Sequence, residues 1–454
     1  MNFFKLFYNL KLDIILFKPY LLKINQVIKN MKINLIKICQ DLYKVPRSLT
    51  GNGVRQTLKY LQKIIPMKIK EVRSGTKVFD WVIPPEWNLK SAYIIDMDTG
   101  KKVVDFENHR LHVMGYSEPI NRKLSYDELV PNLFYLKNQP NAIPFITSYY
   151  KKNWGFCLSY NDFKKLNKNS IYKVLIDSEF DSNGVLNYGE LLLPGKTKEE
   201  IFFSSYICHP QMVNNELSGP SVLVGIANYL KNKNNYYSYR FVLIPETIGS
   251  ITYLSKNLEH LKKYVKGGFN ITCVGDERDW GLVPSRYGEN ISDKVGEHIL
   301  KHSVKNYTKY SWLDRGSDER QYCAPGIDLP ISSITRTRYG RYPEYHTSLD
   351  NFDVVTKKGL EQSLEIYLKC VKVFELSKNI KPKINVFCEP QLGKRGLYTN
   401  TSAKTGAKSV VNMMNFISYC DGKNTILEIS ELCNISFFEA IEIYQKIEAA
   451  NLFV

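Results

Sequence analysis

The sequence predicts an α/β fold, a mostly parallel sheet with flanking helices, with a β-rich insertion and a small helical domain at the end. Two observations support this prediction. In the middle of the chain, apolar runs of strand length alternate with helical stretches, which is the pattern of strand–helix–strand units around a parallel sheet. After Lys381 the strand-length runs give way to short helical stretches.

Residues 1–30 combine apolar side chains with lysines at positions 5, 11, 18, 23 and 29. No uninterrupted run reaches the roughly 18 apolar residues that a spanning helix needs, and no small-residue cleavage site follows the apolar stretch at 12–17. We interpret this segment as a basic N-terminal extension, with a surface-seeking amphipathic helix as the alternative. We expect no integral membrane segment.

Two segments with different sequence patterns precede the alternating region. From Asn34 to Leu61, apolar residues recur at helical spacing around the turn-forming stretch Pro46–Gly53, which predicts two helices. Residues 68–193 are rich in Val, Ile, Tyr, Trp and Phe in short runs, broken by Pro, Gly, Asn and Asp, and predict a β-rich insertion domain. The α/β domain is therefore expected to comprise 31–67 and 194–380.

Four apolar runs of the α/β domain lead into polar residues that can bind metal or carry protons. The runs are Ile201–Cys208, Arg240–Ile244, Phe269–Val274 and Leu329–Ile334, and helical stretches at Ser218–Leu230 and Ile248–Leu258 separate the first three. They are followed by His209, Glu246, Asp276 and Glu277, and by Glu344, His346 and Asp350. Ligands in open α/β sheets bind beyond the carboxyl ends of the strands, so we expect these side chains to converge. Imidazole and carboxylate are the groups that hold a catalytic zinc ion.

Residues 381–454 predict a winged-helix-like end domain with helical stretches at Val410–Ser418, Ile426–Cys433 and Phe437–Ala449. A helix that reads DNA carries Arg or Lys toward the phosphates. The third stretch instead has Glu439, Glu442 and Glu448 against Lys446. We therefore expect a protein contact or homo-oligomer role for this domain, without specific nucleic-acid binding.

Composition sets the broad class of the protein. The formal charge is +17, but the lysines are dispersed. The charge therefore predicts non-specific attraction to anions and no specific partner. Nine scattered cysteines without a CxxC pair are typical of reduced thiols and favour a cytoplasmic location.

Six blocks in the alternating region carry a resemblance to a known superfamily. They are Cys208-His209-Pro210, Asn214–Gly219, Pro245–Ser250, Gly275-Asp276, Gly316–Gln321 and Tyr345–Asp350. Their residues and order resemble the di-zinc aminopeptidase superfamily. From about Met31, with Val78–Trp81, Thr147–Tyr150 and Trp154–Cys157, the chain also resembles a bacterial family of polysaccharide-biosynthesis proteins with an aminopeptidase-like domain, a β insertion and a winged helix.

The resemblance implies roles for individual residues. It makes His209 and Asp276 ligands of one zinc ion and His346 a ligand of the other, with Glu216 as a further ligand and Glu246 as the general base. It places Asn215, Asp318, Arg320 and Tyr345 around the substrate.

Two departures from the family pattern bear on the metal. Asn215 stands where the family has a bridging aspartate, and Thr247 stands where it has a second glutamate. We therefore expect one zinc ion, with two as the alternative. The resulting hypothesis is a zinc-dependent amidohydrolase acting on a small-molecule or peptide-like amide, which the resemblance suggests is a precursor in surface polysaccharide biosynthesis. The alternatives are an acyl or aminoacyl transferase on the same fold and a non-catalytic binding protein.

Overall fold

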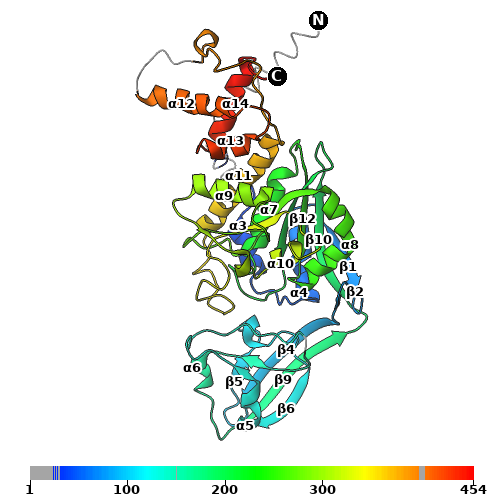
Figure 1. The fold of residues 1–454 in the computed structure, drawn as a ribbon. Coiled ribbons are helices and arrows are strands. Elements are labelled where there is room, and N and C mark those ends of the chain that lie inside the picture. The colour runs from blue at the N-terminus through cyan, green and yellow to red at the C-terminus, as the bar shows by residue number, and fades with distance from the viewer. Residues whose placement is uncertain (1–23, 25, 27, 29–30, 150, 398–403) are drawn as a thin grey trace. The chain divides into compact units, whose positions relative to one another are not determined.

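The computed structural model describes residues 24, 26, 28, 31–149, 151–397 and 404–454 (Figure 1). These residues fall into two compact units, which we describe separately. The larger unit comprises 32–293 and 306–364, and the smaller unit contains 294–305 and 365–454. The predicted N-terminal extension, residues 1–30, lies almost entirely outside the described residues.

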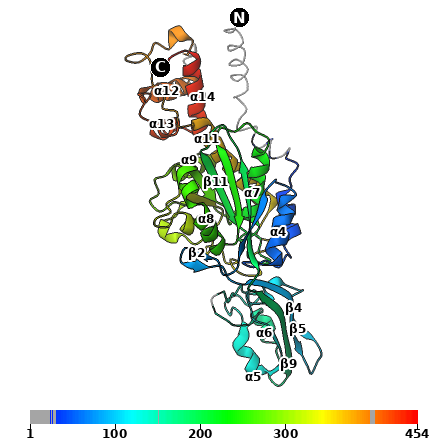
Figure 2. The ribbon, with the colours of Figure 1, turned by 90° about the vertical axis from the view of Figure 1, so that its right-hand side faces the viewer.

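The larger unit is built around an eight-stranded sheet, in agreement with the predicted α/β class (Figures 1 and 2). The strand order is β1-β10-β12-β11-β13-β16-β14-β15. The central strands are β12 (Ser238–Ile244), β11 (Glu200–Tyr206), β13 (Val265–Asn270) and β16 (Ile331–Thr335), and neighbours among them pair in parallel. Each overlaps one of the four predicted apolar runs, although β13 begins before the predicted run and shares only Phe269 and Asn270 with it. Strands β11, β12 and β16 are buried along their whole length.

The edges of this sheet are mixed in direction. On one side, β10 (Val185–Leu193) runs antiparallel to β12, and β1 (Lys68–Arg73) runs antiparallel to β10. On the other side, β14 (Gly281–Val283) runs antiparallel to β16, and β15 (Thr308–Lys309) pairs in parallel with β14.

Helices cover both faces of the sheet (Figure 2). Their bounds are α3 (Leu35–Leu42), α4 (Asn52–Gln62), α7 (Ser218–Leu230), α8 (Ile248–Tyr264) and α10 (Glu319–Tyr322). Helices α9 (Ile291–Ser303) and α11 (Lys357–Ser377) each have residues in both units. Helix α7 is buried nearly all round, and its second residue is a glycine for a steric reason. A Cβ on Gly219 would lie 2.3 Å from the carbonyl oxygen of Ile271. The first turn of α7 can therefore approach the end of β13 only with glycine at this position.

A second, smaller sheet of the larger unit has the order β5-β4-β9-β6 (Figure 1). Its strands are antiparallel: β4 (Glu86–Asp96), β5 (Lys102–Asp105), β6 (Ile120–Ser125) and β9 (Ile171–Asp181). The predicted insertion, 68–193, also contains β1 and β10, and the structure pairs these two strands with the central sheet. The separate sheet thus spans residues 86–181.

Short elements complete the larger unit. They are β2 (Lys77–Val78), β3 (Trp81–Val82), β7 (Leu133–Phe134), β8 (Phe156–Cys157), α5 (Tyr126–Leu129) and α6 (Tyr160–Phe163), with 3₁₀ turns at Arg110–His112, Val130–Asn132 and Trp312–Asp314.

The smaller unit ends in three helices, as the sequence predicts: α12 (Lys404–Ser418), α13 (Ile426–Leu432) and α14 (Phe437–Ala449). A 3₁₀ turn at Gly393–Arg395 precedes them. Thr425 and Ser436 cap the last two helices through side-chain hydrogen bonds to backbone N–H groups. Among the described residues of the whole chain, no helix is both long enough and apolar enough to cross a membrane.

Candidate active site

The predicted site residues come from successive strand ends of the larger unit. His209 follows β11, Glu246 follows β12 and Asp276 follows β13. His346 lies on the loop between β16 and α11. Because β11, β12 and β13 are parallel neighbours, their carboxyl ends lie at the same edge of the sheet.

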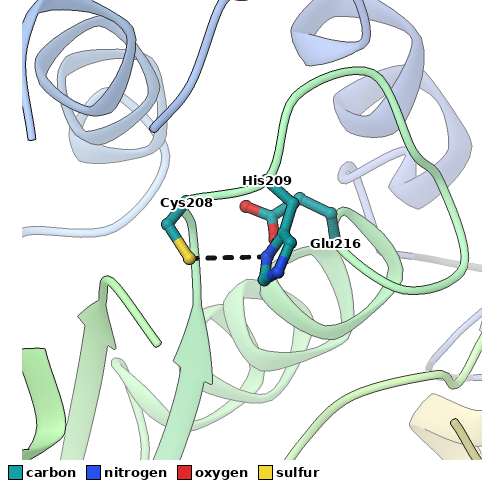
Figure 3. A group of neighbouring side chains, drawn as sticks. All are labelled: Cys208, His209 and Glu216. Carbon is teal, nitrogen blue, oxygen red and sulfur yellow. Dashed lines mark hydrogen bonds and ion pairs between the residues drawn. The ribbon is translucent and has the colours of Figure 1, made fainter. Parts of the chain in front are cut away.

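One edge of the His209 ring, the side of Nδ1, faces buried protein groups (Figure 3). Nδ1 lies 2.9 Å from Oε2 of Glu216 and 3.4 Å from Sγ of Cys208. The buried guanidinium of Arg47 stands behind Glu216, with Nε 3.5 Å from Oε1, and it also donates to the carbonyl of His209 at 3.0 Å. Glu216 is therefore placed to accept a hydrogen bond from the N–H of Nδ1, which leaves Nε2 as the nitrogen with a free lone pair.

Cys208, His209 and Glu216 are close enough to share a metal ion, but their surroundings argue against one on the Nδ1 side. Arg47 already supplies a positive charge next to Glu216. Burial raises the pKa of Cys208 well above its usual value, so its sulfur is a neutral thiol that accepts the N–H of Glu246 at 3.2 Å. A divalent ion here would be repelled by the guanidinium and would lack a thiolate.

The other edge of the His209 ring, the side of Nε2, faces Glu246, and the ring of His346 lies nearby. Nε2 lies 3.7 Å from Oε2 of Glu246, and the ring centroids of the two histidines are 5.4 Å apart. Nε2 of His346 is buried and has no hydrogen-bond partner among the described residues. Burial lowers the pKa of both histidines to about 3, so both imidazoles are neutral at pH 7, the form that binds metal.

Asn215 adds a second unpaired acceptor. Its Nδ2 donates to the hydroxyl of Tyr206 at 2.6 Å, and that hydroxyl lies 2.6 Å from Oγ1 of Thr272. Its Oδ1 is buried without a hydrogen-bond partner in the described structure. The ring of Tyr206 in turn lies 5.3 Å from that of His209. Nε2 of His346 and Oδ1 of Asn215 therefore lack donors, and Nε2 of His209 lies beside a carboxylate. Imidazole nitrogens and a side-chain oxygen are groups that can bind a zinc-like ion.

The β-rich insertion reaches this site through a strap, residues 143–148, that pairs with the loop carrying His346. Phe145 N donates to the carbonyl of His346 at 2.9 Å, and Ser348 N donates to the carbonyl of Ile143 at 2.9 Å. The Phe145 ring lies 4.9 Å from the ring of His209 and 5.2 Å from that of His346. His346 adopts a left-handed φ of 56°, and these backbone bonds help to hold it there.

Tyr345 stacks on the ring of the predicted ligand His346, with ring centroids 3.9 Å apart and planes 15° from parallel. The predicted substrate residue Tyr345 is thus part of the wall around the imidazole. Together with Phe145 it keeps the two histidines in an aromatic environment.

Asp276, predicted as a metal ligand, has both oxygens engaged by the protein. Oδ1 accepts from the Thr337 hydroxyl at 2.7 Å and from the Arg278 N–H at 2.9 Å. Oδ2 accepts from the Thr337 N–H at 3.0 Å and from Nδ2 of Asn214 at 3.1 Å. Four donors leave the carboxylate little capacity for a metal ion. The ligand role of Asp276 therefore stays a prediction, and the structure gives this residue a part in joining two loops.

Asp350 also accepts several hydrogen bonds, and these fix the backbone around Asn215. Its carboxylate accepts backbone N–H groups from Val213, Asn214 and Asn215 at 3.2, 2.6 and 2.9 Å, and the Tyr342 hydroxyl at 3.0 Å. The segment that carries Asn215 and Glu216 is thereby fixed before α7 begins.

Glu246, the predicted general base, shares its surroundings with a second buried acid. Burial raises the pKa of Glu246 well above its usual value; the charge of Asp318 adds to the shift and that of Arg320 opposes it. Burial likewise raises the pKa of Asp318 to about 6, against hydrogen bonds from the N–H of Thr247 and the hydroxyl of Ser250. Such perturbed carboxyl groups in one place are typical of catalytic sites.

The structure thus brings together His209, Glu216, Glu246, Asn215 and His346, and it places Asp318, Arg320 and Tyr345 beside them. Sequence reasoning missed Arg47 and Phe145, which come from a loop near the N-terminus and from the insertion. The only signal available for Arg47 was its place in the turn-forming stretch, which does not reveal a contact with residues more than a hundred positions away.

A second cluster, His298, His302 and Glu431, lies in the smaller unit. Nδ1 of His298 is hydrogen-bonded to Oε1 of Glu431, and the N–H of Phe437 donates to Nε2 at 2.8 Å. Because Nε2 accepts a hydrogen bond, Nδ1 must carry the proton and has no lone pair for a metal. This cluster is therefore a group of hydrogen bonds that holds the start of α14.

The fold and this site define an aminopeptidase-like protein with a C-terminal winged helix. Residues 36–377 match the family described as "Domain of unknown function (DUF4910)", and residues 378–454 match a winged helix-turn-helix family. The chain belongs to the DUF4910 family.

Relatives agree with this assignment. The chain is 41% identical over 422 residues to a Clostridium acetobutylicum protein named "Putative polysaccharide biosynthesis protein with aminopeptidase-like domain", covering 91% of this chain and 95% of that one. It is similar to the crystal structure of a "putative peptidase" from the same organism, with a TM-score of 0.88, 38% identity and coverage of 97% and 99%. The zinc aminopeptidase BSAP from Bacillus subtilis shares the fold alone, with a TM-score of 0.54, 13% identity and coverage of 75% and 94%.

Proposed function

We propose that this protein is a metal-dependent amide hydrolase of the aminopeptidase type that works with a single zinc ion. The observation that carries the proposal is the set of unpaired buried acceptors next to Glu246. Nε2 of His346 and Oδ1 of Asn215 have no donor, and Nε2 of His209 faces Oε2 of Glu246 at 3.7 Å.

His209, His346 and Asn215 would hold the ion. When bound, it supplies Lewis-acid polarisation of a substrate carbonyl and lowers the pKa of a coordinated water to about 7. The neutral imidazoles need no deprotonation before they bind it. Glu216 orients His209 by accepting from Nδ1.

Glu246 would act as the general base. It takes one proton from the attacking water, whose oxygen bonds to the amide carbon, and it returns that proton to the nitrogen as the C–N bond breaks. The products are a carboxylic acid and an amine, so the reaction needs no other reactant. A base that must also act as an acid works best with a raised pKa, and burial supplies that shift.

The substrate class we propose is a small amide in surface polysaccharide biosynthesis, such as an acylated amino sugar. Its support is the name of the C. acetobutylicum relative. The proposed setting is the cytoplasm, which suits the nine free cysteines.

Metal content is the first test. Elemental mass spectrometry on untagged protein should find close to one zinc ion per chain, and the double variant His209→Ala His346→Ala should lose it. The matched control is His109→Ala His112→Ala, which removes two histidines of the insertion and should keep the metal. The loaded protein should then hydrolyse members of an amide library, and the site variant should not. A zinc-supplied protein that binds no metal would overturn the proposal.

A further inference from the structure

Arg320 is a cation placed beside the proposed base, on the short helix α10. Its Nη2 donates to Oγ1 of Thr247 at 2.6 Å. Thr247 directly follows Glu246 in the chain, and its N–H donates to Oδ1 of Asp318 at 2.8 Å, so this contact places the guanidinium beside both acids. It therefore belongs to the wall of the same site as His209 and His346.

Thr247 holds the guanidinium from a strained position. This residue has a φ of 64°, which is unusual for a β-branched side chain. Its N–H donates to Oδ1 of Asp318 at 2.8 Å, and its carbonyl accepts from the Ser250 hydroxyl at 2.9 Å. Strain of this kind persists at functional sites, where the surroundings fix the backbone. Here it directs a threonine hydroxyl at Arg320.

The contact with Thr247 leaves donors on Arg320 unused. Nε is buried and has no acceptor among the described residues. Nη2 carries two hydrogens and Thr247 accepts one, so Nη2 keeps a second hydrogen in addition to the N–H of Nε. Arginine can present donors to both oxygens of a carboxylate, and this planar geometry is what distinguishes it from lysine.

Neighbouring arginines have other partners. Arg336 bonds to Oε1 of Gln362 and lies over the ring of Trp280, and Arg338 donates to the carbonyl of Asp314. Arg278 pairs with both oxygens of Glu344. Arg336 and Arg338 also have a buried Nε without an acceptor among the described residues, so what distinguishes Arg320 is its contact with Thr247, the residue next to the proposed base.

We propose that Arg320 binds a free carboxylate of the substrate, so that the site selects amides that also carry an acidic group. This inference rests on the proposed hydrolase function and names its substrate class. The carboxylate would be bound by Nε and Nη2 of Arg320, with Thr247 fixing the plane of the guanidinium.

The test compares substrates that differ by one charge. Glutamyl and glutaminyl p-nitroanilide differ only in a carboxylate on the acyl half, and a dipeptide and its C-terminal amide differ only in one on the amine half. We expect zinc-loaded protein to favour the acid of at least one pair by about 10- to 100-fold in kcat/KM, the range for a hydrogen-bonded charged group. Equal kcat/KM within both pairs would overturn the inference.

Variants assign such a preference to Arg320. Arg320→Met should reduce the acid-to-amide ratio to near one, and Arg320→Lys should restore part of it. Thr247→Val, which removes the hydroxyl, should lower the ratio through looser positioning. Arg315→Met is the matched control, because Arg315 is an exposed arginine of the same loop, lying over Trp312. The ratio is the readout because a general loss of activity would affect both members of a pair.

A binding measurement separates this inference from the hydrolase proposal. Calorimetric titration with free glutamate and with glutaminamide, which has no carboxylate, should show tighter binding of glutamate, lost in Arg320→Met. If glutamate binds in this way but no amide is hydrolysed, the inference stands and the hydrolase proposal fails. If amides are hydrolysed without an acid preference and neither compound binds through Arg320, the hydrolase proposal stands and the inference fails.

Discussion

Oε2 of Glu216 lies 2.9 Å from Nδ1 of His209, and Oε1 of the same carboxylate lies 3.5 Å from Nε of Arg47. Glu216, which the sequence predicted as a metal ligand, thus contacts Nδ1 of His209, the ring nitrogen that does not face Glu246. Burial raises the pKa of Glu216, and the charge of Arg47 opposes that shift and favours the ionised carboxylate. A carboxylate in this place fixes the ring orientation and increases the basicity of the nitrogen that binds metal.

Replacing Glu216 by glutamine should weaken metal binding without abolishing it. An amide oxygen can still accept from Nδ1, but it lacks the negative charge, so we expect a loss of about 10- to 100-fold in zinc affinity. Competition with a chromogenic chelator measures this. Glu200→Gln removes a buried carboxylate paired with Arg240 at the opposite end of β11, and it should reduce stability while leaving zinc affinity unchanged. Equal zinc affinity in Glu216→Gln and the unchanged protein would contradict this role.

Replacing Asn215 by aspartate should increase the affinity for the single zinc ion and leave the zinc content near one per chain. The new carboxylate would add charge at the unpaired oxygen. A second ion would still lack ligands, because Thr247 has no carboxylate and Asp276 already accepts four hydrogen bonds. Elemental mass spectrometry after dialysis against zinc checks this, and a content near two would show that the site accepts a second ion after all.

Glu246→Gln should separate metal binding from turnover. The amide keeps the size of the side chain but cannot take a proton from water, so we expect at least a 100-fold fall in kcat. Zinc content should remain near that of the unchanged protein, because the histidines and Asn215 are intact. A variant with undiminished turnover would remove Glu246 from the mechanism.

Local patterns in the sequence predicted the central fold well. Helix α7 spans Ser218–Leu230, as its periodicity indicates, and α14 spans Phe437–Ala449. Such segments are predictable because a continuous apolar run or a 3.6-residue period reflects contacts within one element. The convergence of His209 and Glu246 also followed, because parallel neighbours end at one edge of a sheet.

Contacts between distant parts of the chain could not be predicted from local patterns of this kind. Nothing near Phe145 in the sequence indicates that it reaches His209 and His346, because its place depends on pairing between the strap and a loop some 200 positions later. The extent of the insertion also depends on pairing between distant strands, which local patterns do not indicate. The strands β1 and β10 have the composition of the insertion, yet their partners lie in the central sheet.

Glu86→Gln should reduce the acid sensitivity of the larger unit. Arg55 holds the pKa of Glu86 at about 2, against about 4.5 in an unfolded chain, through bonds of 2.5 and 2.9 Å. A lowered pKa stabilises the fold above pH 4.5, and this contribution is lost as the pH falls from 4.5 toward 2. With allowance for solvent screening, it amounts to about 1–2 kcal/mol. Urea unfolding should show this advantage over the variant at pH 7 and a smaller one at pH 3.5; a constant difference would contradict it.

Phe145→Ala should make the protein release metal at a higher pH. Burial lowers the pKa of His209 and His346 to about 3, so protons compete with a metal ion for these nitrogens only in strong acid. Removing the aromatic ring that covers both imidazoles admits water, and their pKa values should rise toward about 6.5. Zinc should then be lost on dialysis from about pH 6 downward, whereas the unchanged protein retains it to lower pH. Phe145→Leu keeps an apolar cover and should behave like the unchanged protein. If all three proteins release zinc at the same pH, the insertion does not shield these histidines from water.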